Sequence, residues 1–203
     1  SVQNLPKLPG HTVVAVDLSG SMCAPVSAKS KIAQSEVASL LGALCAGISS
    51  DVTIIGFGQT MQVLIPDHDE DPLRLTDRVR HLSVGHSTNA YLVPEYLLTN
   101  RIPVDRLLLF SDMQCYGGDE RYRGSGDGTS FAQLVKRYRA TVNPRLRVFS
   151  VDLAGYGTSQ LAEGDPLTSL LSGWSERVLE LVSLTERRDT VLKMIEDGNF
   201  EHG

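Results

Sequence analysis

The fold is decided by the stretch Thr12–Met22, whose sequence is TVVAVDLSGSM. Its first part, Thr12–Leu18, is a nearly continuous apolar run rich in β-branched side chains, which is typical of a strand buried on both faces. The run meets a carboxylate at Asp17, and the hydroxyls of Ser19 and Ser21 follow on either side of a glycine. Short oxygen-bearing side chains at the end of a buried strand suit a hard cation such as Mg²⁺, Mn²⁺ or Ca²⁺ rather than zinc or copper. We therefore predict a metal-binding loop at the carboxyl end of a central strand.

Outward from this stretch, apolar segments alternate with segments of helical periodicity. Further strands are predicted at Asp51–Phe57, Thr60–Ile65, Arg106–Phe110, Arg145–Asp152 and Val178–Val182. Helices are predicted at Lys29–Ile48, Leu73–Leu82, Ala90–Asn100, Phe131–Arg139, Pro166–Ser172 and Ser183–Ile195. This alternation predicts an α/β fold of the doubly wound type, with helices on both faces of a mostly parallel central sheet and with Thr60–Ile65 as one antiparallel edge strand. In such sheets ligands bind at the carboxyl ends of the strands.

A second strand also runs into an acid, because Arg106–Phe110 is followed by Ser111 and Asp112. Thr88 belongs to a polar loop that opens with a glycine. Since the carboxyl ends of parallel strands share one edge of the sheet, we expect a single site there. Helix capping or turn formation would explain any one of these residues alone. The combination in this order favours a metal site with the ligands Asp17, Ser19, Ser21, Thr88 and Asp112.

The composition is that of an ordinary globular protein, with 41% hydrophobic and 21% charged residues in a chain of 203. No apolar run approaches the roughly 18 residues of a membrane span, and the start of the chain lacks the apolar core of a signal peptide. A net charge of −5 argues against a surface devoted to nucleic acid. The three cysteines (Cys23, Cys45 and Cys115) lack a CxxC spacing and favour a reducing, cytoplasmic setting. We expect residues 1–10 to be the remnant of a linker and residues 11–203 to form one domain.

The pattern Asp17-x-Ser19-x-Ser21, followed by Thr88 and then by Asp112 after an apolar strand, resembles the metal-ion-dependent adhesion site of von Willebrand factor A domains. The resemblance implies a Rossmann-like fold in which these residues hold Mg²⁺ directly or through water. It also implies a position on the ion for a carboxylate or another anion of a protein ligand. Because hydroxyl ligands are neutral, the ion keeps much of its attraction for such a group. The expected function is therefore a divalent-metal-dependent protein-interaction module, and we expect no enzymatic activity.

Three shorter motifs, DLSGSM, SDMQ and GWSERVLELVSL, resemble the C-terminal A domain of Ro60-like (TROVE) ribonucleoproteins. In that family a ring of helical repeats precedes the A domain and binds small noncoding Y RNAs and defective RNAs. The resemblance implies a role in noncoding-RNA binding and quality control, with Y RNA or misfolded RNA contacted mainly through a ring domain absent from this chain. An acidic protein ligand is the partner implied for the metal site, and no membrane association is expected.

Two other functions stay open at this point. One is a metal-dependent phosphatase or phosphotransferase with Asp17 as nucleophile, although Ser19 stands where such chemistry needs a general acid. The other is an adhesion-type A domain that binds an acidic protein ligand outside any RNA particle.

The acidic loop 67–72 mimics the start of an EF-hand, but Pro72 occupies the position that requires glycine, so we predict a solvated loop. Tyr116–Thr129 has no periodicity and predicts a mobile loop.

Overall fold

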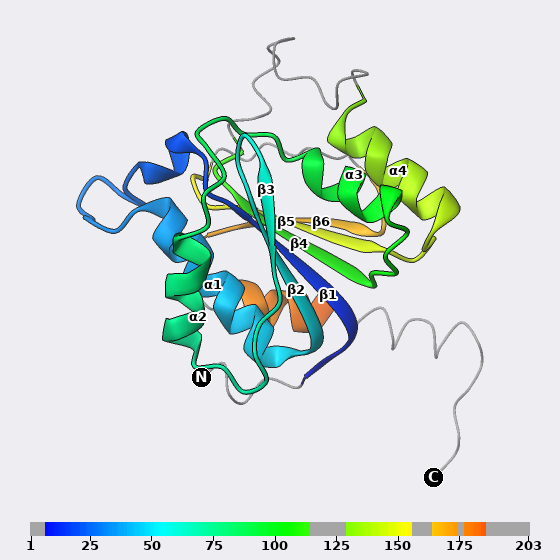
Figure 1. Ribbon diagram of the computed structural model, residues 1–203, viewed down its shortest axis with the longest axis horizontal. Coiled ribbons are helices and arrows are strands. Elements are labelled where there is room, and N and C mark those ends of the chain that lie inside the picture. Colours follow the sequence, from blue (N-terminus) through cyan, green and yellow to red (C-terminus); the bar gives the residue numbers. More distant parts are fainter. Residues whose placement is uncertain (1–6, 114–128, 156–163, 174–176, 186–203) are drawn as a thin grey trace.

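The computed structural model describes residues 7–113, 129–155, 164–173 and 177–185 of the chain. These residues form one six-stranded sheet in the order β3-β2-β1-β4-β5-β6 (Figure 1). The strands are β1 (Leu8–Asp17), β2 (Ser49–Phe57), β3 (Met61–Leu64), β4 (Arg106–Ser111), β5 (Arg147–Asp152) and β6 (Thr168–Ser172). Every neighbouring pair is parallel except β2 with β3, where the edge strand runs antiparallel. The predicted fold class is confirmed.

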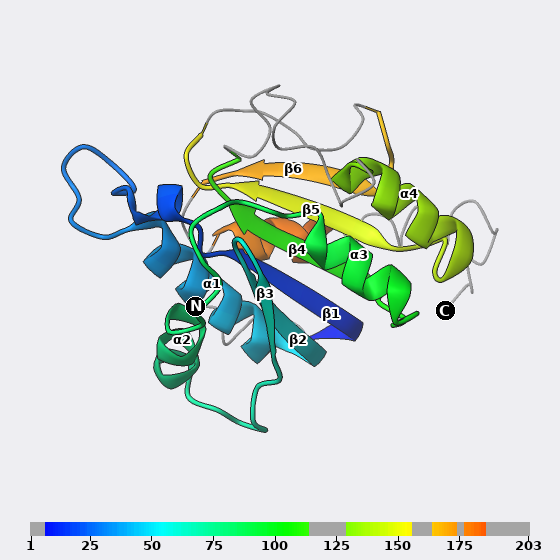
Figure 2. The same cartoon turned by 45° about the horizontal axis from the view of Figure 1, so that its top comes forward.

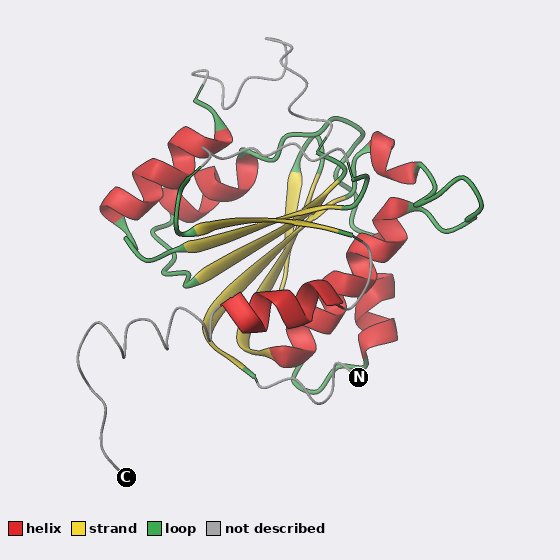
Figure 3. Ribbon diagram, turned by 180° about the vertical axis from the view of Figure 1, so that it is seen from behind, coloured by secondary structure: helices red, strands yellow, loops and turns green. Residues whose placement is uncertain are grey.

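Helices cover both faces of the sheet, as the view from behind in Figure 3 shows. They are the short 3₁₀ helix η2 (Gly20–Cys23) and the α-helices α1 (Gln34–Ile48), α2 (Pro72–Arg80), α3 (Leu92–Thr99) and α4 (Phe131–Thr141). Residues 177–185 are also helical. α1, α2 and the helix of residues 177–185 share one face of the sheet, and α3 and α4 share the other (Figures 1 and 3). None of the described helices is long and apolar enough to cross a membrane.

β1 is the central strand that separates two hydrophobic cores. Its alternate residues Val14 and Val16 belong to the core on the α1 side, whereas Val13 and Ala15 belong to the core on the α3 side. This division follows from the two-residue period of a strand, which points successive side chains to opposite faces. All four side chains are fully buried. The prediction of a strand buried on both faces is therefore confirmed.

The boundaries of two N-terminal elements differ from the prediction. β1 begins at Leu8, four residues before the predicted Thr12, because Leu8 pairs with Ser49 at the start of β2. α1 begins at Gln34 rather than at Lys29. Residues 24–33 instead form a projecting loop, coloured blue in Figure 2, that is closed by a bridge between positions 25 and 33. The loop follows η2 directly, and both lie beyond the carboxyl end of β1.

The helix predicted at Pro166–Ser172 is wrong, because Thr168–Ser172 forms the edge strand β6 beside β5 (Figure 2). The strand predicted at Val178–Val182 is wrong as well, because this segment is helical. Its buried residues Val178, Leu179 and Val182 follow the spacing of one helix face, with exposed residues between them. These three side chains pack into the hydrophobic core on the α1 side of the sheet, which a helix lying on that face allows. Residues 186–195 of the predicted C-terminal helix and residues 116–128 of the predicted loop lie outside the described residues.

Candidate metal site

The carboxyl ends of β1 and β4 lie side by side, and they bring two predicted acids to the same place. Val16 of β1 pairs with Phe110 of β4, so Asp17 and Ser111 follow in register. The Ser111 hydroxyl donates a hydrogen bond of 2.6 Å to Asp17 Oδ2. Asp112 follows the last residue of β4, is buried, and lies close enough for its charge to raise the pKa of Asp17. The expectation that both acids meet at one edge of the sheet is met by this geometry.

Asp17 is fully buried, and its two carboxylate oxygens are held from different directions. The backbone N–H of Ser19 donates to Oδ1 at 2.9 Å, and Ser111 donates to Oδ2. Burial raises the pKa of Asp17 to about 6, and the charge of Asp112 adds to this effect, whereas the hydrogen bonds oppose it. Among the described residues, Asp17 receives hydrogen bonds but no ion pair. A cation placed here would offset a buried negative charge.

The hydroxyls of Ser19 and Ser21 lie next to one another because η2 turns the chain tightly after Asp17. Their Oγ atoms are 3.2 Å apart. Ser19 is fully buried and Ser21 half-buried. Two neighbouring ligands of an octahedral Mg²⁺ ion with bonds of about 2.1 Å lie about 3 Å apart. The spacing of the two hydroxyls therefore fits adjacent positions on such an ion.

The loop that carries Thr88 is fastened beside this turn. The backbone N–H of Gly20 donates to the carbonyl of His86 at 2.9 Å, which joins the two loops directly. The same loop is held from its other side, where the N–H of Asn89 donates to the carbonyl of Gly58 at 3.0 Å. A Cβ at Gly58 would lie 2.8 Å from the Gly85 carbonyl oxygen, so this approach requires glycine. Thr88 itself is half-buried within the loop.

The kinds of donor atoms decide which cation these residues fit. Among the described residues, no group of three or more His, Cys, Asp or Glu side chains gathers as a metal cluster. The predicted ligand set contains two carboxylates, Asp17 and Asp112, and otherwise hydroxyls. Such oxygen donors fit a hard divalent cation, whereas zinc and copper favour nitrogen and sulfur.

Sequence reasoning missed two polar residues at these strand ends, Ser111 and Asp152. Ser111 contacts Asp17 directly. Asp152 ends β5 opposite Ser111 in register, is fully buried, and accepts hydrogen bonds of 2.9 Å from the backbone N–H groups of Ala154 and Gly155. The sequence signal that could have revealed Asp152 is that β5, like the strands before Asp17 and Asp112, is an apolar segment followed by an acid. The two backbone hydrogen bonds give Asp152 a role in forming the turn after β5.

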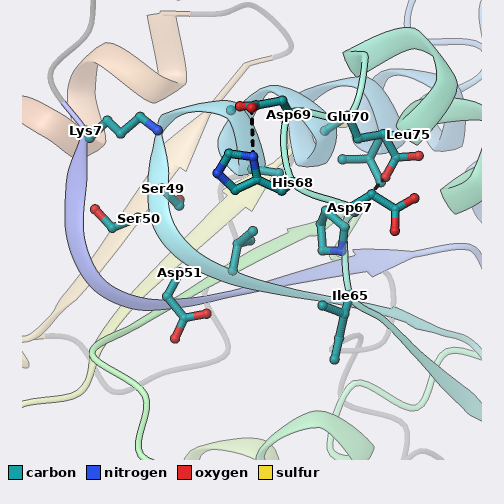
Figure 4. A pocket seen from close by; sticks show the side chains of 15 residues that line it. Lys7, Ser49, Ser50, Asp51, Ile65, Asp67, His68, Asp69, Glu70 and Leu75 are labelled. Carbon is teal, nitrogen blue, oxygen red and sulfur yellow. Dashed lines mark hydrogen bonds and ion pairs between the residues drawn. The ribbon is translucent and has the colours of Figure 1, made fainter.

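A cavity of about 290 Å³ lies away from this site, beside the carboxyl end of α1, and none of the predicted ligands lines it (Figure 4). The acidic loop borders this cavity, and three of its carboxylates interact with α2. Asp71 caps α2 by accepting from two backbone N–H groups, and Arg78 of α2 makes ion pairs with Asp67 at 3.2 Å and with Glu70 at 2.5 Å. Asp67 and Asp69 are exposed, as predicted for a solvated loop, whereas the side chain of Glu70 is buried.

No protein-family profile matches the sequence, and no curated protein matches it significantly. Solved structures do match. The Ro (RSR) protein of Deinococcus radiodurans has a TM-score of 0.69 at 13% identity over 92% of this chain and 36% of its own. Proximal thread matrix protein 1 from the mussel byssus has a TM-score of 0.55 at 11% identity, covering 89% of this chain and 48% of its own. A mutant of the PilB minor pilin of Streptococcus sanguinis has a TM-score of 0.53 at 12% identity, covering 94% and 62%.

This chain therefore spans about a third of the Ro protein and less than two thirds of the other two. Identities this low demonstrate a shared fold and nothing finer. The match to the Ro protein extends over nearly the whole of this chain. The chain has a von Willebrand A-type fold, related in structure to part of the Ro protein.

Proposed function

We propose that the chain is a protein-interaction module that binds a divalent cation through Asp17, Ser19, Ser21, Thr88 and Asp112, and an acidic protein ligand through that cation. Mg²⁺ is the proposed ion, with Mn²⁺ and Ca²⁺ as alternatives. The observation that carries the proposal is the fully buried Asp17 carboxylate, with a pKa raised to about 6, next to two hydroxyls 3.2 Å apart. A bound cation would supply the positive charge that an acidic side chain can coordinate.

The division of labour among these residues follows from their chemistry. Asp17 and Asp112 supply the negative charge, whereas Ser19, Ser21 and Thr88 supply neutral oxygens. Because the hydroxyl donors add no negative charge to that of the two carboxylates, the ion can still coordinate an anionic ligand. The hydrogen bond between Gly20 and the His86 carbonyl supports the joint use of both loops.

Two features support binding rather than turnover. Ser19 occupies the position where a phosphotransferase with Asp17 as nucleophile would need a general acid. Both oxygens of Asp17 already accept hydrogen bonds, which ties the carboxylate to the protein. We expect no hydrolysis of a generic phosphate ester with Mg²⁺, Mn²⁺ or Ca²⁺. Turnover that Asp17→Asn abolishes would instead establish a metal-dependent phosphatase.

The structural similarity to the Ro protein supports a setting within a Ro-like ribonucleoprotein that handles noncoding or defective RNA. Since this chain spans 36% of that protein, we propose that RNA is held mainly by a part outside this chain. The net charge of −5 supports this division, because nucleic-acid surfaces are usually basic. The scarcity of cysteine supports a cytoplasmic location. Fluorescence anisotropy with a labelled structured RNA should give weak, non-specific binding to this chain.

The metal site is tested by calorimetric titration of Mg²⁺, Mn²⁺ and Ca²⁺ into the parent chain and its Asp112→Ala variant. The parent should bind and Asp112→Ala should lose binding, because the variant removes one of the two charged ligands. Asp69→Ala is the control, since it removes an exposed acid of the acidic loop that is not among the proposed ligands. Equal binding by the parent and Asp112→Ala, or no binding by the parent, would contradict the proposed site.

A further inference from the structure

We propose that Ser111 is a positioning residue of the metal site, whose hydroxyl holds the Asp17 carboxylate in the orientation that faces the cation. The inference rests on the proposed metal site and adds a residue that is not among its five predicted ligands. Ser111 is fully buried at the end of β4, immediately before Asp112. It therefore lies between the two acids of the site and belongs to the strand that neighbours β1.

The hydrogen bond from Ser111 to Asp17 has the character of a bond to an ionised acid. The distance from Ser111 Oγ to Asp17 Oδ2 is 2.6 Å. Hydroxyl-to-carboxylate bonds are typically about 2.5–2.7 Å long and about twice as strong as neutral ones. The bond lies in a fully buried environment where water cannot replace it. Loss of the Ser111 hydroxyl would leave one oxygen of a buried carboxylate without this donor.

The backbone after Asp112 directs the hydroxyl proton of Ser111. The N–H of Met113 donates to Ser111 Oγ at 3.1 Å. A serine hydroxyl has a single proton, so an N–H that points at its oxygen leaves that proton to be donated elsewhere, here to Asp17. Met113 adopts a left-handed conformation with φ of 59°, which is uncommon for a residue with a side chain. The chain therefore accepts an unfavourable backbone conformation where this hydrogen bond is made.

The hydrogen bonds to Asp17 come from two different parts of the chain, Ser19 and Ser111. The Ser19 N–H belongs to the same loop as Asp17, whereas Ser111 reaches across from β4. The bond from Ser111 links the carboxylate to the end of β4, directly before Asp112. Without it, the Asp17 side chain could turn about its Cα–Cβ bond relative to the second acid. Partners that orient metal ligands in this way typically change metal affinity by about 10–100-fold when they are removed.

The test compares Ser111→Ala, which removes the hydroxyl, with Ser111→Thr, which keeps it. Ser39→Ala is the matched control, because Ser39 is a fully buried serine whose hydroxyl bonds a carbonyl within α1. Mg²⁺ and Mn²⁺ affinities are measured by calorimetry, and thermal unfolding in EDTA establishes that each variant is folded. Ser111→Ala should weaken metal binding by at least about 10-fold. Ser111→Thr should retain most of the affinity, and Ser39→Ala should retain all of it.

The possible outcomes separate this inference from the proposed function. If the parent and Ser111→Ala bind metal equally, the metal site stands and the role of Ser111 is refuted. The role is also refuted if folded Ser111→Thr is as weak as Ser111→Ala, since the hydroxyl would then be irrelevant. If Ser111→Ala does not fold, Ser111→Gly takes its place because it also lacks the donor, and binding at the parent's level refutes the inference. No binding by the parent overturns the proposed function together with the inference.

Discussion

Replacement of Asp17 by asparagine should stabilise the metal-free protein at neutral pH, although it removes a buried, doubly hydrogen-bonded side chain. Burial raises the pKa of Asp17 from its ordinary 3.8 to about 6. At pH 7 the carboxyl is ionised in both states, and the folded state disfavours the ionised form by about two pH units, or about 3 kcal/mol. Asparagine keeps the shape of the side chain without its charge. We expect a gain of about 1–3 kcal/mol, because asparagine can replace the hydrogen bonds only in part.

The sign of the pH dependence follows from the raised pKa. The folded carboxyl takes up a proton below pH about 6, whereas the unfolded one does so only below 3.8. Protonation therefore favours the folded state fully below pH 3.8, and this contribution is lost as the pH rises from there through about 6. The advantage of Asp17→Asn over the parent should accordingly be largest at neutral pH and should shrink as the pH approaches 4.

The assay is urea unfolding in EDTA at pH 4, 5 and 7, repeated with Mg²⁺ at pH 7. Excess Mg²⁺ should stabilise the parent, by about 2.7 kcal/mol at 100 times its dissociation constant, and should leave Asp17→Asn unchanged. Asp152→Asn is the control, because Asp152 is a buried strand-end acid that accepts two backbone hydrogen bonds. That variant should be destabilised. The reasoning would be refuted if Asp17→Asn were less stable than the parent in EDTA at pH 7.

Two further predictions concern contacts outside the ligand set. Tyr138→Phe should destabilise the chain by about 1–3 kcal/mol in urea unfolding, without changing metal affinity, because the buried hydroxyl donates to the Ile102 carbonyl at 2.6 Å and accepts from the Val104 N–H at 2.8 Å. An unchanged unfolding midpoint would contradict this. Gly58→Ala should weaken metal binding in calorimetry, because its Cβ would press against the Gly85 carbonyl and displace the loop that carries Thr88. Parent-like affinity in a folded variant would separate that loop from the site.

The central part of the fold could be predicted because its sequence signals are local and strong. The run Val13–Val16 before Asp17 lacks polar positions on either face, which is typical of a strand between two helical layers. The convergence of Asp17 and Asp112 was also predictable, since parallel strands end at the same edge. The contact between Asp17 and Ser111 was not predictable, because it depends on the register of Val16 with Phe110. No local pattern encodes that register.

The C-terminal errors have a different cause. Thr168–Ser172 is short, and its residues are only half-buried or exposed, so its periodicity does not distinguish an edge strand from a helix. Its conformation is determined by the hydrogen-bond ladder with β5, which is a long-range interaction. Residues 178–182 did carry a usable signal. The apolar residues Val178, Leu179 and Val182 stand at helical spacing with Glu180 between them, but the additional apolar Leu181 makes the segment look like a short apolar strand.

The central position of β1 has a mechanical consequence for anything bound at its end. η2 is anchored by Met22 in the core on the α1 side, whereas the segment after Thr88 is anchored by Ala90 in the core on the α3 side. The candidate site therefore lies at the edge of the sheet, between the helical layers that pack on its two faces. A cation coordinated by both Ser19 and Thr88 would connect the segments that are anchored in the two cores. Its binding would slow hydrogen exchange in helices on both faces, so that the two layers open together rather than independently.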